Sequence, residues 1–207
     1  MRKTSLCISL SLVSMLFCSL VLMGKTRVGK SASGNTILGR NVFQSAANSA
    51  SQTRKCCCHK ALRAGREISV IDTPGIFDTE LSPHAFLVVI SLAGCFTREE
   101  KSTVDEVKKT FQNADKYTMI LFTYKDNLKQ NIQHFLENGD PELRELVAKC
   151  RNHYHCLNNT AASYRQFKEL LGKIEEMVAE NEGRYYTDVI YQELESTIQD
   201  IQEQKLK

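Results

Sequence analysis

The sequence has little of what marks several classes of protein. Among its 207 residues there are three prolines, ten glycines and no tryptophan, while 42% of residues are hydrophobic and 25% are charged. This balance excludes a collagen-like repeat and a mainly disordered chain. The net charge is only +3, which is too little for a general nucleic-acid-binding protein with a basic stripe. We therefore expect a globular α/β domain with an appendage, and no nucleic acid as a partner.

The eight cysteines lack a paired C-x-x-C framework. Three of them are consecutive, at residues 56–58, and neighbouring cysteines cannot easily pair with each other. We expect reduced thiols rather than a disulfide scaffold. Two zinc sites stay open as alternatives, one from Cys56–Cys58 with His59 and the other from Cys150 and Cys156 with His153 and His155.

The N-terminal apolar run admits two interpretations. Met1-Arg2-Lys3 precedes an uncharged stretch from Ser5 to Met23, which is close to the ~20 residues that cross a bilayer. As a signal or anchor, residues 5–23 would place the protein at a membrane. As a buried strand over residues 17–23, the run belongs to a cytoplasmic protein, with or without membrane contact through the apolar extension at residues 1–16. We favour the strand, because a phosphate loop follows at once and must begin at the end of a strand.

Residues 24–31 read G-K-T-R-V-G-K-S and match the phosphate-loop pattern G-x-x-x-x-G-K-[ST] at every fixed position. Gly24 and Gly29 permit the backbone angles that turn N–H groups inward around an anion. A helix that begins near Lys30 points its positive end at the phosphates. The Lys30 ammonium would reach the β- and γ-phosphates, and the Ser31 hydroxyl would bind Mg²⁺. The pattern predicts nucleotide binding.

A second phosphate-side motif follows a strand at residues 66–71, where the sequence reads D-T-P-G over residues 72–75. Asp72, at the end of the strand, would hold Mg²⁺ through water, and the Gly75 N–H would sense a γ-phosphate. The two motifs together favour a GTPase over a small-molecule kinase.

The segment between the two motifs, residues 41–60, is rich in Ser, Ala and Thr. This composition predicts a mobile loop, which in a GTPase is the first switch. We choose Thr53 as the threonine that closes on Mg²⁺, and leave Ser45, Ser49 and Ser51 as alternatives. The expected metal ligands are therefore Ser31, Thr53 and Asp72.

Two apolar runs, at residues 85–92 and 117–123, predict buried strands. The second ends in T-Y-K-D at residues 123–126. The Asp126 carboxylate can accept hydrogen bonds from guanine N1–H and the exocyclic amine together, a donor pair that adenine lacks. Residues 155–160 suit a short strand and a base-side loop, in which Asn158 or Asn159 would touch the guanine. The expected nucleotide-binding residues are Gly24, Lys25, Thr26, Arg27, Val28, Gly29, Lys30, Ser31, Ala32, Thr53, Asp72, Gly75, Thr123, Asp126 and Asn158; the catalytic residues are unknown.

Helical patterns complete the chain. A capping box at residues 97–100 opens one helix. Ser163 caps a second, and Thr187 begins a surface helix for which a coiled coil is the alternative. The second helix should bury Phe167, Leu170, Leu171, Ile174 and Val178. We expect an α/β fold of the P-loop GTPase type, a mainly parallel sheet with helices on both faces. Its nucleotide-binding domain spans residues 17–180, and a helical extension follows over residues 181–207.

These motifs together resemble the GTPases of immunity-associated proteins (GIMAP/IAN), a family related to septins. The residues that carry the resemblance are 21–39, 71–79, 92–101, 121–128 and 156–159. It implies binding of GTP or GDP with Mg²⁺, self-association as a homo- or hetero-dimer through the nucleotide face, and a switch or scaffold role in immune-type cells. Members of the family differ in whether they hydrolyse GTP at a useful rate.

The chain departs from the family at its apolar start, at Tyr124, where a basic residue or histidine is usual, and after Asp72. The family places a helix between the D-x-x-G segment and the next strand, whereas Pro74–Pro83 runs almost directly into that strand. Ten extended residues span roughly 33 Å, but parallel crossovers usually take about a dozen residues or more. We therefore expect lower stability and an impaired second switch.

Hydrolysis should be slow in the monomer. Ile76 stands where Ras-like enzymes use a glutamine to orient water. We expect a GTPase of low intrinsic activity, with any catalytic group supplied across a dimer. The alternatives are a non-hydrolysing, GTP-dependent assembly module, and a membrane-anchored or crippled variant.

Overall fold

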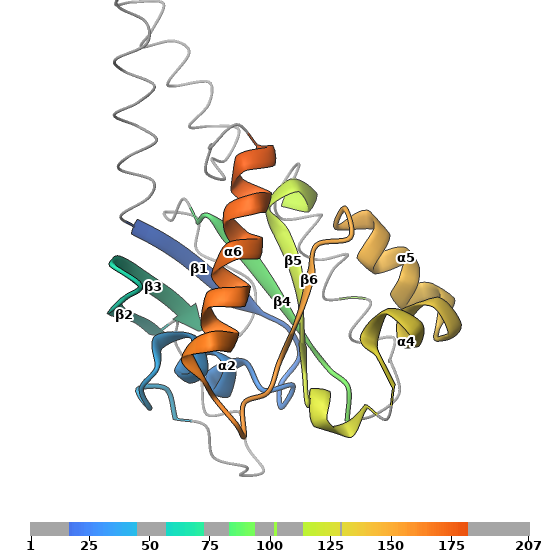
Figure 1. Ribbon diagram of the computed structural model, residues 1–207, viewed down its shortest axis with the longest axis horizontal. Helices are drawn as coiled ribbons and strands as arrows, with labels where there is room; N and C mark the ends of the chain where they lie inside the picture. The colour runs from blue at the N-terminus through green and yellow to red at the C-terminus, as the bar shows by residue number, and fades with distance from the viewer. Residues whose placement is uncertain are drawn as a thin grey trace, which may run out of the picture.

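The fold is built on a six-stranded sheet with the strand order β2-β3-β1-β4-β5-β6 (Figure 1). The computed structural model describes residues 17–44, 57–72, 83–93, 102, 114–128 and 130–181. Within these residues, β2 runs antiparallel to β3 and the other neighbouring strands run parallel. The strands are β1 (Phe17–Met23), β2 (Cys57–Arg63), β3 (Arg66–Asp72), β4 (Ala85–Ser91), β5 (Thr118–Thr123) and β6 (Tyr154–Leu157).

The apolar run that ends at Met23 supplies the central strand β1. It pairs with β3 on one side and with β4 on the other, and all its residues except Phe17 are buried. A strand buried on both faces is a continuous apolar run, as the sequence has it. The predicted strand over residues 17–23 is thus confirmed, while residues 1–16 lie outside the described part. No helix among the described residues is long and apolar enough to cross a membrane.

The hairpin of β2 and β3 corrects one prediction. We expected residues 41–60 to form a loop, but residues 57–60 begin strand β2. This strand lies at the edge of the sheet and its side chains are exposed or half-buried, so it lacks the apolar run that marks the inner strands. A two-residue turn joins β2 to β3, with positive φ of 52° at Ala64 and 75° at Gly65. Positive φ at both central residues is typical of the tightest hairpins.

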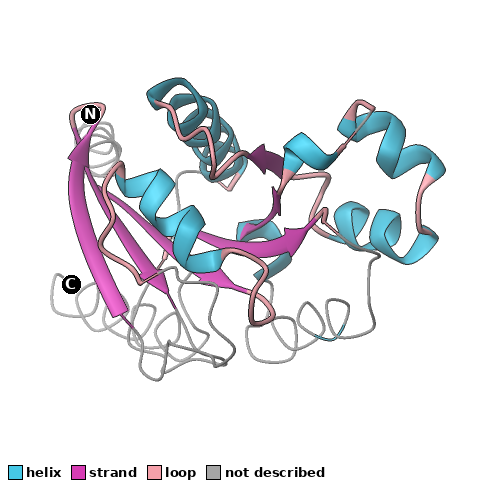
Figure 2. Cartoon of the chain, turned by 90° about the horizontal axis from the view of Figure 1, so that it is seen from below, coloured by secondary structure: helices cyan, strands magenta, loops and turns pink. Residues whose placement is uncertain are grey.

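Helices cover both faces of the sheet, as the sequence predicted (Figure 2). One core cluster contains side chains from α2 (Lys30–Leu38) and α6 (Tyr164–Glu180). The other contains side chains from α4 (Ile132–Asn138) and α5 (Pro141–Lys149). Two short 3₁₀ helices, η1 (Ala114–Tyr117) and η2 (Lys125–Asn127), flank β5.

Helix α6 confirms its predicted start and most of its predicted inner face. The Ser163 side chain accepts a hydrogen bond from the backbone N–H of Gln166 at 3.3 Å, which makes it the N-cap. Phe167, Leu170, Leu171 and Ile174 are buried as predicted. Met177 is the next fully buried residue, whereas Val178 is only half-buried. The apolar stripe therefore continues from Ile174 at a spacing of three residues rather than four.

Helices α4 and α5 were not predicted. Each begins at a side chain that accepts from the backbone N–H two residues on, Asn131 for α4 and Asp140 for α5. Pro141 occupies the first turn of α5, where a missing N–H costs nothing. The sequence signals are thus local caps, and both helices are too short for a strong periodic pattern.

The sheet order bears on the shortened crossover. β3 and β4 are parallel and flank β1, so the chain after Asp72 crosses β1 before it enters β4. Residues 73–82 of this connection lie outside the described part, as do the helix expected at residues 97–100 and the extension from residue 182 onward.

Candidate functional site

The candidate site lies at the edge of the sheet where β1, β3, β4, β5 and β6 all end. These strands are parallel, so their carboxyl ends meet on one side. The loops that leave them carry the predicted motifs: residues 24–29 after β1, Asp72 at the end of β3, residues 123–126 after β5, and residues 158–159 after β6. Ligands of open α/β sheets bind in this crevice.

The phosphate loop has a backbone that its two glycines require. Gly24 has φ of 135°, and a Cβ there would lie 2.6 Å from the carbonyl oxygen of Val89 in β4. Gly29 has φ of 97° and precedes the first residue of α2. Arg27 also has a positive φ, 71°, which costs energy in a non-glycine residue. The loop thus has positive φ at three residues, and its first glycine packs closely against β4.

The Lys30 ammonium lies across this loop. Its Nζ donates to the carbonyl oxygens of Gly24 at 2.7 Å and Lys25 at 2.9 Å. Burial lowers the pKa of Lys30, and the nearby Asp72 carboxylate raises it in part. The ammonium is thus a partly desolvated cation at the predicted phosphate position.

Ser31 and Asp72 meet directly. The Ser31 hydroxyl donates to Asp72 Oδ2 at 2.6 Å, which joins the first turn of α2 to the end of β3. Asp72 is 1% exposed, and its Oδ1 is buried with no hydrogen-bond partner among the described residues. Burial raises the pKa of Asp72, while the Ser31 hydroxyl and the Lys30 ammonium lower it. A desolvated carboxylate with an unpartnered oxygen beside a hydroxyl is a donor set that suits Mg²⁺.

The described residues give no geometric support to the zinc alternatives, one of which includes Cys56, outside the described part. Among the described residues, no group of three or more His, Cys, Asp or Glu side chains is placed to hold a metal ion. Cys58 and Cys156 form no disulfide within this part of the chain. Besides Ser31, Asp72 and the expected ligand Thr53, a Mg²⁺ ion here would take ligands from phosphate oxygens and water.

Thr123, at the end of β5, holds the phosphate loop through a side-chain hydrogen bond. It is fully buried, and its hydroxyl donates to the carbonyl oxygen of Val28 at 2.7 Å. Tyr124, which follows it, has φ of 58° and is 38% exposed. The left-handed residue turns the chain into η2, which carries Asp126.

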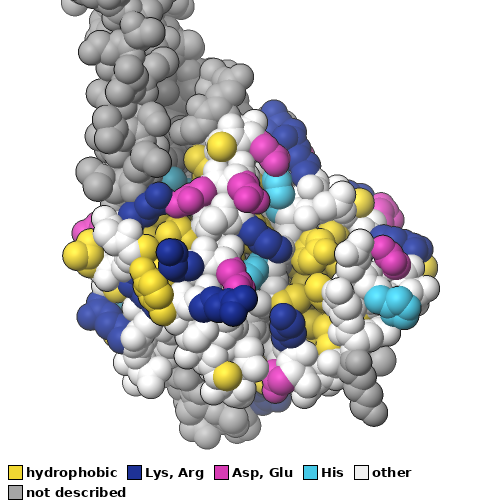
Figure 3. Space-filling view, viewed as in Figure 1, with side chains coloured by type: hydrophobic (Ala, Val, Ile, Leu, Met, Phe, Trp, Pro, Cys, Tyr) yellow, Lys and Arg dark blue, Asp and Glu magenta, His cyan; other side chains and the backbone are white. Residues whose placement is uncertain are grey.

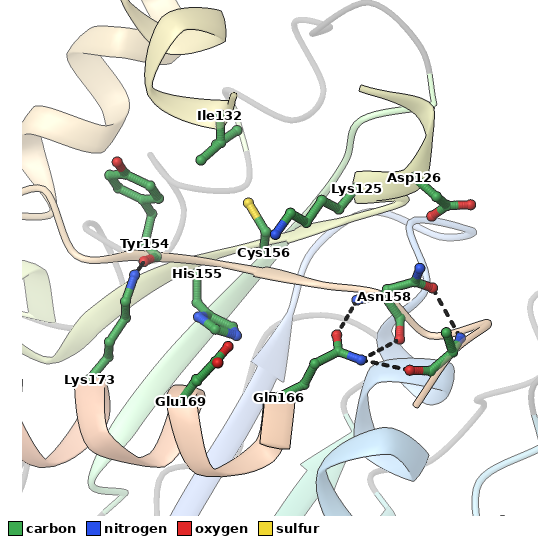
Figure 4. A pocket seen from close by; sticks show the side chains of 11 residues that line it. Lys125, Asp126, Ile132, Tyr154, His155, Cys156, Asn158, Gln166, Glu169 and Lys173 are labelled. Atoms are coloured by element: carbon green, nitrogen blue, oxygen red, sulfur yellow. Dashed lines mark hydrogen bonds between the residues drawn. The ribbon is translucent and has the colours of Figure 1, made fainter. Parts of the chain in front are cut away.

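The predicted base readers border a pocket of about 640 Å³ (Figure 4). Asp126 and Lys125 line it from η2, and Asn158 and Gln166 line it from the loop after β6 and from α6. Hydrophobic side chains gather in this hollow between α6 and the α4–α5 pair, with basic side chains around it (Figure 3). Asp126 is exposed, and its carboxylate points away from Lys125 and Cys156 (Figure 4).

Asn158 is the centre of a turn. Its Oδ1 accepts from the Thr160 N–H at 2.9 Å, the Thr160 hydroxyl at 2.6 Å and the Ala161 N–H at 3.1 Å. Its backbone N–H donates to Gln166 Oε1 at 2.8 Å. The side-chain oxygen is thereby committed to the loop itself.

Two asparagines in and around α2 show roles that the sequence did not reveal. Asn35 Oδ1 accepts from the backbone N–H groups of Val42 and Phe43, at 2.9 and 2.8 Å, and its Nδ2 donates to the Phe43 carbonyl at 2.9 Å. Asn159 reaches from the loop after β6 to α2, where it forms hydrogen bonds with Ser33 and Thr36.

Two further predicted site residues, Thr53 and Gly75, lie outside the described residues.

Comparison with known proteins gives matches over most of the chain. The model of the AIG1 family matches residues 18–205. GTPase IMAP family member 8 of Homo sapiens is 34% identical over 183 residues, which are 81% of this chain and 27% of that protein. Immune-associated nucleotide-binding protein 13 of Arabidopsis thaliana is 34% identical over 217 residues, 90% of this chain and 64% of that protein. The chain thus spans about a quarter of the length of the human relative and just under two thirds of the length of the Arabidopsis relative.

Solved structures share the fold. Toc33 of Arabidopsis thaliana in complex with Mg²⁺ and GMPPNP has a TM-score of 0.61 at 13% identity, over 86% of this chain and 95% of that one. A structure described with the finding that dimerization is important for the GTPase activity of the chloroplast translocon components Toc33 and Toc159 has a TM-score of 0.66 at 16% identity. It covers 88% of this chain and 91% of that one. The chain therefore belongs to the AIG1 family and has the P-loop GTPase fold, as the resemblance of its motifs predicted.

Proposed function

We propose that this chain binds GTP and GDP, with Mg²⁺, in the loop from Gly24 to Ser31. The observation that carries the proposal is the 2.6 Å contact of Ser31 with Asp72, beside a buried carboxylate oxygen that has no partner among the described residues. A buried carboxylate oxygen without a hydrogen-bond partner is costly. A divalent cation and a phosphate chain would offset that cost.

The roles follow from the charges of the described side chains. The backbone N–H groups of residues 24–31, at the N-terminus of α2, would receive the phosphates. The Lys30 ammonium would exchange its bonds to the Gly24 and Lys25 carbonyls for phosphate oxygens. Ser31 and Asp72, with Thr53 as the third expected ligand, would hold Mg²⁺, which neutralises phosphate charge when bound.

The base would lie at the ends of β5 and β6. The exposed Asp126 carboxylate is available to accept the two guanine donors, N1–H and the exocyclic amine. Asn158 lines the same pocket as Asp126. Thr123 takes part by holding the phosphate loop through the Val28 carbonyl rather than by facing solvent. Together they favour guanine over adenine.

We further propose that hydrolysis is slow in the monomer and depends on a homo- or hetero-dimer formed through the nucleotide face. Ile76 replaces the glutamine that orients water in Ras-like enzymes. Toc33, which shares the fold, is described as a protein for whose GTPase activity dimerization is important. Residues 17–180 would be the nucleotide-binding domain of a switch or scaffold in immune-type cells, extended by a helix or coiled coil over residues 181–207.

The same replacement at residue 76 supports a second candidate, a module that binds GTP to assemble without hydrolysing it. A third candidate, a membrane-anchored or crippled variant, rests on the apolar residues 1–16 and the shortened crossover. A rate of GTP hydrolysis per molecule of protein that rises with protein concentration would favour the dimer-dependent GTPase. Nucleotide-dependent association without turnover would favour the module. Pelleting with membranes would favour the anchored variant, and so would a glycan on Asn158, because residues 158–160 read N-N-T and match the glycosylation sequon N-x-[ST].

A binding titration tests the main proposal. A fluorescent GTP analogue would be titrated into the full chain with Mg²⁺ and then competed with GDP and with ATP. We expect displacement by GDP and not by ATP, and loss of binding in Lys30→Ala. The matched control is Lys168→Ala, since this lysine is exposed on α6. Unchanged affinity in Lys30→Ala would refute the phosphate loop, and equal competition by ATP would refute the role of Asp126.

A further inference from the structure

Asn159 connects two parts of the candidate site that are far apart in the sequence. It lies in the loop between β6 and α6, and its side chain reaches the helix that follows the phosphate loop. Its Oδ1 accepts from the Thr36 hydroxyl at 2.9 Å, and its Nδ2 donates to the Ser33 hydroxyl at 3.1 Å. A single amide thus uses its acceptor and its donor on two successive turns of α2.

The two hydroxyls on α2 depend on this amide. Ser33 is fully buried and Thr36 is 5% exposed, so water cannot readily replace a hydrogen-bond partner that either hydroxyl loses. The bond to Asn159 is the side-chain hydrogen bond that each of them makes within the described residues. Loss of one partner from a buried polar pair costs more than the bond itself is worth. The contact therefore fixes the position of the loop between β6 and α6 relative to α2.

The same amide lies beside the phosphate loop. A Cβ at Gly29 would meet Asn159 Nδ2 at 3.5 Å and Thr123 Cγ2 at 3.5 Å. Thr123 is itself bonded to the Val28 carbonyl. The ends of β5 and β6, which carry the expected base readers, thus converge on one glycine of the phosphate loop.

We propose that Asn159 is a positioning residue for guanine selectivity, and that it contacts α2 rather than the base. Its amide holds the Asn158 turn at a fixed place relative to α2, so that the base and phosphate subsites form one rigid unit. The inference rests on the proposed function, that a guanine nucleotide binds between these loops. It adds a residue that sets the distance between the two subsites.

The geometry separates this role from the stability of the fold. Helix α2 has other anchors, since Arg63 donates to the carbonyl oxygens of Thr36 and Ile37, and Ile37 and Leu38 are buried in the core. Asn158 keeps its own turn through Thr160 and Gln166. Loss of the Asn159 amide therefore frees the loop to shift as a body and leaves the fold intact.

The test compares affinities of the full chain for GDP and ADP, by competition against a fluorescent GDP analogue with Mg²⁺. Asn159→Ala should weaken GDP binding about tenfold, because the released loop must be ordered again when the nucleotide binds. ADP binding should change less, so the ratio of the two affinities falls. Asn138→Ala, at an exposed asparagine of α4, is the control and should leave both values unchanged.

A double-mutant cycle with Thr36→Val, which removes the hydroxyl and keeps the volume, extends the test. If the contact acts as proposed, Asn159→Ala and Thr36→Val are not additive, and the double variant binds GDP about as well as Asn159→Ala alone. Thr36→Val also serves if Asn159→Ala fails to fold, and should itself lower the GDP-to-ADP ratio.

Two outcomes would overturn the inference, and they are distinguishable. GDP binding by the unchanged chain together with an unaltered GDP-to-ADP ratio in the variants, or with fully additive effects, overturns the role of Asn159 alone. Absence of GDP binding by the unchanged chain overturns the proposed function and this inference with it.

Discussion

Phe43 packs on helix α2 directly over Gly34, where a Cβ would lie 2.7 Å from Cε2 of the ring. The Asn35 amide holds the backbone of Phe43 in place from both sides, as donor and as acceptor. Phe43 also contacts the His59 ring edge-on, at 4.9 Å between centroids. The chain that leaves α2 is thus folded back onto the helix, and this contact needs a residue without a side chain.

Substitution of Gly34 by alanine should therefore destabilise the protein, although alanine favours helix. The new methyl group displaces the Phe43 ring, and overpacking of this kind costs about 1–3 kcal/mol. The higher helix propensity of alanine offsets at most about 1 kcal/mol of this loss in the free energy of unfolding. Urea denaturation of Gly34→Ala at neutral pH should show a lower midpoint with an unchanged slope.

Gly172 supplies the matched control for that experiment. It lies within α6, and a Cβ there would meet nothing within 4 Å. Gly172→Ala should therefore raise the free energy of unfolding by about 0.5–1 kcal/mol. A gain of similar size in both variants would show that Phe43 yields without cost, and would contradict the packing argument.

The inner strands, and the loop and carboxylate that follow β1 and β3, were predictable from the sequence for one physical reason. Strands such as β1 and β5 are buried on both faces, so each is a continuous apolar run, and each precedes a motif of fixed spacing. The phosphate loop needs its glycines, lysine and serine at set positions, so residues 24–31 and Asp72 could be named in advance. Strand β2 and helices α4 and α5 lie at edges or are short, and carry no such pattern.

The contacts that hold the site together were not predictable. Asn159 and its partner Thr36 lie 123 residues apart in the sequence, and Thr123 and its partner Val28 lie 95 apart. Serine, threonine and asparagine are also common in loops that do nothing of the kind. They meet only because the parallel sheet brings the ends of β1, β5 and β6 to the same edge.

Neutralising Asp72 should separate the stability of the protein from its metal dependence. Burial raises the pKa of this carboxyl, so the charged form costs stability as the pH rises through that pKa. At neutral pH, Asp72→Asn removes the cost and keeps an acceptor for the Ser31 hydroxyl. The unfolding temperature without nucleotide should stay the same or rise.

The nucleotide readout of Asp72→Asn should move the other way. Affinity for a fluorescent GTP analogue should lose its dependence on Mg²⁺, measured as the ratio of dissociation constants with Mg²⁺ and with EDTA. Asp115→Asn, in η1, is the control. A Mg²⁺ dependence in Asp72→Asn as large as in the unchanged chain would exclude this carboxylate from the metal site.

Two buried histidines should make the fold sensitive to mild acid. Burial lowers the pKa of His84 to about 4 and that of His155 to about 4, with Lys173 and Lys125 adding to the shift at His155. His84 Nδ1 accepts from the Ser19 N–H at 3.0 Å, which needs the neutral ring. The unfolded chain binds protons near pH 6.5, so stability is full above about pH 6.5 and falls as the pH drops toward 4.

The measurement is the free energy of unfolding in urea at pH 7, 6 and 5. Each histidine should account for a loss of roughly 2 kcal/mol between pH 7 and pH 5. His155→Gln cannot titrate and should show a shallower dependence, whereas His134→Gln, at an exposed position of α4, should follow the unchanged chain. An equally steep loss in His155→Gln would mean that other groups carry the acid sensitivity.

Arg63 is expected to be the side chain on which the far end of α2 depends most. It donates to the carbonyl oxygens of Thr36 at 2.9 Å and Ile37 at 2.5 Å, which α2 leaves open at its C-terminal end. Its guanidinium lies 4.1 Å from the centre of the Phe167 ring, so one residue of β2 joins α2 to α6. Arg63→Ala should cost about 2–3 kcal/mol in urea denaturation, from two hydrogen bonds and a cation–π contact.

Arg63→Lys should recover less than half of that loss, because a single ammonium cannot satisfy two carbonyls and cover a ring as a planar fork does. Arg165→Ala breaks only an exposed ion pair with Glu169 and should cost about 1 kcal/mol or less. Arg63 lies at the end of α2 away from Ser31, so the folded Arg63→Ala chain should bind GDP within about threefold of the unchanged chain. A large loss of affinity at full folding would show instead that the two ends of α2 are coupled, and that the phosphate loop depends on the hairpin of β2 and β3.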